Sequence, residues 1–144
     1  MNEVKRAVIV SAVRTPMGSF NGMFSQVPAT KLGSLAIAEA LKRVHVQPDR
    51  VDQVYMGCVL SAGLGQAPAR QASIEAGIPH SIGAATVNKV CGSSIQTVIM
   101  ATQAIVLGET NMMSYPDARQ LPRGKRQVNL FHATLTSKEL KSFE

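Results

Sequence analysis

The chain has 144 residues, enough for one domain, and 45% of them are hydrophobic but only 4% aromatic, so the core has to be aliphatic. Its net charge of +6 is not gathered into one basic stripe with interleaved aromatic residues, which argues against nucleic acid as a partner. No stretch approaches the roughly 20 apolar residues of a membrane span, and the N-terminus lacks a signal-peptide or transit-peptide pattern, so we expect a cytoplasmic protein without a membrane partner.

Strands and helices alternate along the first three quarters of the chain. Thr30 is the expected N-cap of the first helix. The apolar runs that predict strands are 6–13, 51–59 and 85–90, and the helices are expected from Thr30 to a stop before Pro48, from 68 to 76 and from 92 to 107. Such alternation is typical of the α/β class, in which helices cover a mixed, mostly parallel sheet.

The run Thr86-Val-Asn-Lys-Val-Cys91-Gly-Ser-Ser94 places a cysteine between a predicted strand and the first turn of the last helix. Backbone N–H groups and the dipole at a helix N-terminus favour a thiolate over a thiol. The small residues 92–94 would let a substrate carbonyl approach the sulfur and backbone N–H groups together, as in an acyl-transfer site with a nucleophile beside an oxyanion hole. On the pattern alone, the alternative for Cys91 is a small buried packing residue.

The last helix is expected to bury one apolar stripe and to end at Gly108. The residues of this stripe recur near the i, i+3, i+4, i+7 spacing of a single helix face. They are Ile95, Val98, Ile99, Thr102, Ile105 and Val106.

The remaining cysteine and the histidines indicate neither a disulfide nor a metal site. Cys58 lies in a strand-like run and is expected to be a buried apolar residue, so no disulfide framework is predicted. His45, His80 and His132 have no metal-ligand spacing, and Gly63-Leu-Gly65 lacks the third glycine of a dinucleotide fingerprint. We therefore expect no metal and no bound cofactor.

Several consecutive blocks of the sequence resemble the thiolases, and in particular the acetyl-CoA acetyltransferase branch. They are Val8 to Pro16, Gly18 to Gly22, Pro28 to Ser34, Gly63 to Gln71, and the cysteine motif from Val87 to Ser93. The resemblance implies a thiolase-like half-domain in which Cys91 is the catalytic nucleophile that carries an S-acyl group. It also implies that coenzyme A thioesters are substrates, that acetoacetyl-CoA is formed or cleaved, and that the protein is a homo-oligomer.

The resemblance covers roughly residues 5–113 and then changes abruptly. It implies two units, an N-terminal half-domain at 1–116 and a divergent tail at 117–144 that faintly resembles the start of the coenzyme A-binding loop domain. Ser94 stands where the family usually has glycine. No residue matches the family's Gly-His-Pro histidine, its Cys-x-Gly second cysteine or its Asn-Glu-Ala-Phe asparagine. An incomplete chain that is inactive alone is therefore expected; the alternative is a non-catalytic remnant or an inert partner of a full-length thiolase.

Overall fold

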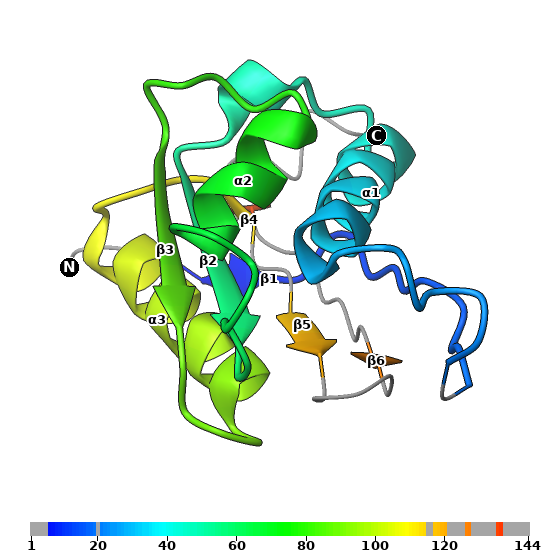
Figure 1. Cartoon of the computed structure of the whole chain (residues 1–144). Helices are drawn as coiled ribbons and strands as arrows, with labels where there is room; N and C mark the ends of the chain where they lie inside the picture. Colours follow the sequence, from blue (N-terminus) through cyan, green and yellow to red (C-terminus); the bar gives the residue numbers. More distant parts are fainter. Residues whose placement is uncertain (1–5, 20, 115–116, 121–125, 128–134, 137–144) are drawn as a thin grey trace, which may run out of the picture.

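The computed structural model describes residues 6–19, 21–114, 117–120, 126–127 and 135–136 (Figure 1). At its centre, strand β2 (Gln53–Cys58) pairs in parallel with β3 (Gly83–Val87). Two more parallel strands, β4 (Met113–Ser114) and β5 (Asp117–Gln120), follow one another along β2. Strand β6 (Arg126–Gln127) joins β5 in the antiparallel direction, so the sheet is mixed and mostly parallel, as predicted.

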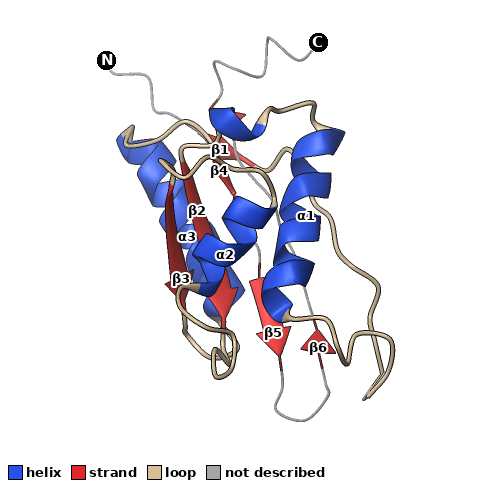
Figure 2. Ribbon diagram, turned by 45° about the horizontal axis from the view of Figure 1, so that its top comes forward, coloured by secondary structure: helices blue, strands red, loops and turns tan. Residues whose placement is uncertain are grey.

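Helices cover both faces of this sheet (Figure 2). α1 (Ala29–Arg43) and α2 (Pro68–Glu75) lie side by side on one face, and α3 (Ser93–Leu107) lies on the other. The side chains of β2 alternate accordingly, because Val54 and Met56 join the core on the α1 and α2 side while Tyr55 packs against the core cluster of α3. The α/β class is thereby confirmed.

The first helix has Pro28 as its N-cap, so the prediction of Thr30 is wrong. The Pro28 carbonyl accepts the N–H groups of Lys31 at 3.1 Å and Leu32 at 3.2 Å, and no side chain caps this end. Thr30 is buried inside the first turn. The fixed φ of proline directs the chain into the helix without a hydroxyl cap. Beyond the helix, a short 3₁₀ helix, η1 (Pro48–Arg50), leads to β2.

The first predicted strand is much shorter than the apolar run that indicated it. Only β1 (Ala7–Val8) forms, antiparallel to β7 (Leu135–Thr136), and it is half-buried. Ser11 and Val13 are nevertheless buried further along the run. The prediction of a buried strand over 6–13 therefore holds only in part, because Ile9 is 56% exposed and the strand that forms covers Ala7–Val8.

Helix α3 buries a different stripe from the predicted one. Its buried residues are Ser93, Thr97, Ala101, Ala104 and Ile105. Of the predicted stripe, only Ile105 is buried, whereas Ile95 is 64% exposed. The reason is that α3 is apolar almost all round, so periodicity could not identify which face meets the sheet. The small side chains face the sheet and let α3 approach closely, and the predicted stop at Gly108 is confirmed by its φ of 79°.

The same composition corrects the expectation that no segment comes near a membrane span. Among the described residues, the window Val90–Leu107 is long and apolar enough to cross a membrane by length and composition alone, with 28% of it buried. It contains no charged residue. A soluble protein's core helix has this composition too.

The predicted division into 1–116 and 117–144 stays a prediction. Strands β5, β6 and β7 are the described parts of the tail, and β5 extends the sheet with Asp117 opposite Gly57. The other positions of the tail lie outside the described residues.

Candidate active site

Cys91 lies in the turn that leads from β3 into α3, directly before the helix N-cap Gly92. It is exposed, while Cys58, in β2, is only 1% exposed. Both predicted locations are therefore correct, and the alternative of a buried packing role does not fit Cys91. The thiol stands next to the N-terminal end of α3.

The turn around Cys91 is tight. The N–H of Gly92 donates to the Lys89 carbonyl at 2.9 Å, and the N–H of Ser93 donates to the Val90 carbonyl at 3.2 Å. A Cβ added at Gly92 would come within 3.3 Å of the Lys89 oxygen, so glycine fits this close approach better than any larger residue. Val90 has φ of 46°, in the left-handed region that branched side chains seldom adopt.

These contacts correct part of the expected oxyanion hole. The N–H groups of Gly92 and Ser93 are engaged by carbonyls within the turn. Ser93 is fully buried, so its small side chain does not line an access route to the sulfur. The exposed thiol at the start of a helix is confirmed, and an oxyanion hole beside it stays a prediction.

The side chains of Ser93 and Asn88 hold the turn, a role that the sequence did not predict for either. The Ser93 hydroxyl accepts the Lys89 N–H at 2.9 Å and donates to the Val90 carbonyl at 2.7 Å. The Asn88 side chain accepts the Val90 N–H at 3.0 Å and donates to the Val59 carbonyl, just beyond β2, at 3.1 Å. A serine two residues after the cysteine and an asparagine three before it were the available signal, but neither spacing corresponds to a standard cap.

Lysine supplies the positive charge of this region. The Lys89 ammonium donates to the Gln96 side chain at 2.8 Å, which places it beside the first turn of α3. The strand that precedes the turn is tied to α2, because the Thr86 hydroxyl accepts the N–H of Ala69 at 3.1 Å. The turn is thus anchored to both neighbouring layers.

The polar residues of α2 stabilise loops. Gln71 donates to the carbonyls of Leu64 and Gln66, both at 2.7 Å. The Arg70 guanidinium donates to the carbonyls of His80 and Ile82, which fixes the turn before β3. These side chains position the strand that carries the cysteine motif.

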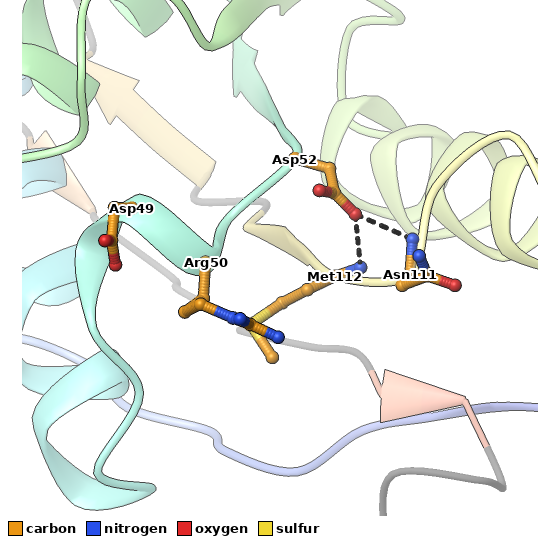
Figure 3. A pocket seen from close by; sticks show the side chains of 5 residues that line it. All are labelled: Asp49, Arg50, Asp52, Asn111 and Met112. Atoms are coloured by element: carbon orange, nitrogen blue, oxygen red, sulfur yellow. Dashed lines mark hydrogen bonds between the residues drawn. The ribbon is translucent and has the colours of Figure 1, made fainter.

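A separate polar cavity of about 240 Å³ lies between the entry to β2 and the segment before β4 (Figure 3). One Asp52 carboxylate oxygen accepts the N–H groups of Asn111 at 2.7 Å and Met112 at 3.0 Å and the Thr110 hydroxyl at 2.9 Å. Burial raises the pKa of Asp52, but these hydrogen bonds and the nearby Arg50 outweigh it, so the pKa lies below its ordinary value. The carboxylate therefore has a structural role.

No side-chain cluster in the described part of the chain suits a metal ion, because no group of three or more His, Cys, Asp or Glu residues gathers there. The candidate site consists of Cys91 and its turn. An exposed thiol is a group that can serve as a nucleophile.

Comparison with known proteins assigns this chain to a family. The thiolase N-terminal domain matches residues 7–115. An acetyl-CoA acetyltransferase of Schizosaccharomyces pombe is 56% identical over 105 residues, which are 73% of this chain and 27% of that protein. Acetyl-CoA acetyltransferase 2 of Arabidopsis thaliana is 61% identical over 100 residues, 69% of this chain and 25% of that protein. The chain belongs to the thiolase family.

A solved structure supports the same conclusion. The crystal structure of the Acat5 thiolase from Ascaris suum in complex with coenzyme A is similar, with a TM-score of 0.79 and 37% identity over 88% of this chain and 36% of that one. The chain spans about a quarter of the length of the two curated relatives described. A relative from Danio rerio, 51% identical over 78% of this chain and 26% of that protein, is named as mitochondrial, and the cytoplasmic location stays a prediction.

Proposed function

We propose that the chain supplies the nucleophilic part of a thiolase-type acyltransferase that acts on coenzyme A thioesters, with Cys91 as the residue that carries the acyl group. The observation that carries this proposal is an exposed thiol at the start of α3 in a chain whose relatives are acetyl-CoA acetyltransferases. The coenzyme A complex of the Ascaris suum thiolase supports the substrate class.

In the proposed reaction, the Cys91 thiolate attacks the carbonyl carbon of acetyl-CoA. A bond forms between this carbon and the cysteine sulfur, the bond to the coenzyme A sulfur breaks, and coenzyme A leaves as a thiolate that takes up a proton. The enolate of a second acetyl-CoA then attacks the acyl carbon, which releases Cys91 and yields acetoacetyl-CoA. The reverse sequence cleaves acetoacetyl-CoA.

The experiment is to incubate the purified chain with acetyl-CoA and to locate any acetyl group by mass spectrometry of its peptides. We expect one acetyl group on the peptide that contains Cys91, none after Cys91→Ala, and an unchanged result after Cys58→Ala. Acetylation that persists in the Cys91→Ala variant, or that never occurs in the unaltered chain, would contradict the proposal.

A partner-only function is the alternative. The exposed apolar residues of α3, among them Ile95 and Leu107, favour it, because such a surface is suited to contact with another protein. In that case the chain would co-elute with a full-length thiolase in gel filtration and would take up no acetyl group. Acetylation at Cys91 without co-elution would favour the acyltransferase.

A further inference from the structure

We propose that Ser93 is a positioning residue that acts through the backbone on Cys91, by holding the preceding residue in a left-handed conformation. This inference rests on the proposed function, since it gives a role to Ser93 only if the Cys91 thiol reacts.

Val90 is the residue whose left-handed backbone conformation has to be stabilised. Four described residues other than glycine have positive φ, and they are Asn21, His45, Ala67 and Val90. Only Val90 among them is branched at Cβ, the type for which this conformation is a genuine outlier. Its side chain is 65% exposed, so packing does not account for the conformation. We therefore attribute the positive φ of Val90 to the hydrogen bonds made by the backbone around it.

Ser93 supplies two of these bonds at once. Its hydroxyl accepts from the N–H of Lys89 and donates to the carbonyl of Val90, so one oxygen atom closes a ring that contains Cys91. Ser93 itself is completely buried, whereas Cys91 is exposed. The fixed hydroxyl therefore determines where the chain turns and leaves the thiol on the outside of that turn.

A simple capping role for Ser93 does not fit the geometry. Ser93 is the first residue of α3, and this helix has no side-chain cap hydrogen bond. Its hydroxyl bonds backwards to the turn and not forwards to an N–H group of the helix. Asn88 assists from the other side by accepting the Val90 N–H.

The test compares Ser93→Ala with Ser73→Ala. Ser73 is a matched control, because it is also buried in a helix and its hydroxyl also donates to the carbonyl three residues earlier, at 2.9 Å. The measurement is the rate of Cys91 alkylation by iodoacetamide, followed by peptide mapping. We expect Ser93→Ala to slow alkylation by about fivefold, since the turn that keeps the Cys91 thiol exposed would lose the two hydrogen bonds that hold it. Ser73→Ala should leave the rate unchanged.

A rescue variant separates positioning from general stability. Val90→Gly, combined with Ser93→Ala, should restore the rate, because glycine adopts positive φ without steric cost. An unslowed Ser93→Ala chain, equal slowing by Ser73→Ala, or a failed rescue in folded protein would overturn the proposal.

If Ser93→Ala does not fold by circular dichroism, Asn88→Ala provides the same test from an exposed position. It should slow Cys91 alkylation and be rescued by Val90→Gly, and an unchanged rate would overturn the proposal. Alkylation needs no acyl donor, so a chain that fails to accept acetyl from acetyl-CoA but gives these rates refutes the proposed function and not the role of Ser93.

Discussion

Asp52 joins the entry of β2 to the segment that leads into β4 through one carboxylate oxygen. That oxygen accepts two backbone N–H groups and one hydroxyl from three consecutive residues, 110–112. Hydrogen bonds of this kind favour the ionised carboxylate, which is why the pKa lies below its ordinary value despite some burial. A single side chain thus fixes the register between two strands that are far apart in the sequence.

We expect Asp52→Ala to lower the free energy of unfolding at neutral pH by about 1 kcal/mol, a value reduced for solvent screening because Asp52 is largely exposed. Because the folded pKa is depressed, this contribution is fully present above the ordinary value of 3.8 and is lost as pH falls through the folded pKa. Urea unfolding at neutral and acidic pH measures it.

Asp49→Ala is the matched control, since Asp49 lines the same cavity without taking part in the three bonds (Figure 3). It should leave the free energy of unfolding almost unchanged. If the free energy of unfolding of the Asp52→Ala variant stayed below that of the unaltered chain by the same amount down to strongly acidic pH, the carboxylate charge would not be the cause of the stabilisation.

At the scale of elements, α1 and α2 approach closely at Gly33. A Cβ at this position would lie 3.3 Å from Ala72 Cβ in α2 and 3.3 Å from Met56 Cε in β2. The methionine end can move, but Ala72 Cβ is fixed to the α2 backbone. The packing of two helices on one face of the sheet therefore depends on a missing side chain.

We expect Gly33→Val to lower the free energy of unfolding by about 2 kcal/mol, because the added methyl groups overpack this contact. The control is Gly83→Val in strand β3, where a Cβ would meet nothing within 4 Å. Thermal unfolding of both variants measures the difference. If the Gly33→Val and Gly83→Val variants had equal melting temperatures, α1 and α2 could move apart without loss of stability.

Helix α3 leaves large apolar side chains uncovered on its outer side. Ile95, Ile99, Val106 and Leu107 are between 41% and 73% exposed. Burial of such side chains against another molecule is favourable at about 25 cal/mol per Å² of apolar surface. This side of the helix is therefore the part of the chain most suited to association.

We expect the unaltered chain to self-associate and the double variant Ile95→Ser, Leu107→Ser to do so much less. Sedimentation velocity over a range of concentrations measures the effect. Leu35→Ser on α1 is the control, since Leu35 is also exposed, at 51%, but lies on the other face of the sheet. If the control dissociates the protein as well as the double variant does, α3 is not the contact surface.

The helices and strands could be predicted from the sequence where a residue pattern is compatible with a single local structure. Proline at the start of α2 and glycine after α3 mark helix ends by backbone chemistry, so both boundaries lie where expected. Prediction failed where a pattern had two meanings. The run 6–13 is apolar without being a strand throughout, and α3 has more than one apolar face.

The candidate site was predictable only in part for a similar reason. Cys91 could be found because a cysteine before a helix is a local pattern. Ser93 and Asn88 act through backbone atoms of Lys89, Val90 and Val59, and these contacts exist only once the chain has folded. The left-handed conformation of Val90 could not be anticipated, since nothing in a valine favours it.

At the scale of the whole molecule, the chain contains one motif of thiolase chemistry within a half-domain. Its relatives are about four times as long as the part that matches, and the whole proteins' activity belongs to those longer chains. The resemblance to thiolases implies a histidine base and a second cysteine, and the sequence contains neither of their motifs. Within these 144 residues, the resemblance therefore offers no candidate for proton transfer at the cysteine or at the α-carbon.

As a polypeptide of these 144 residues acting alone, the protein is expected to cleave acetoacetyl-CoA at no measurable rate, although we expect Cys91 to accept an acetyl group. Each missing acid–base group removes a factor of about 10²–10⁴ in rate, and lost substrate positioning lowers the rate further. The assay follows acetoacetyl-CoA cleavage by protein prepared from a host without thiolase, with Cys91→Ala as the control. Turnover that disappears in the Cys91→Ala variant would mean that the chain supplies its own bases, because a thiolate without them could complete only the first half of the reaction.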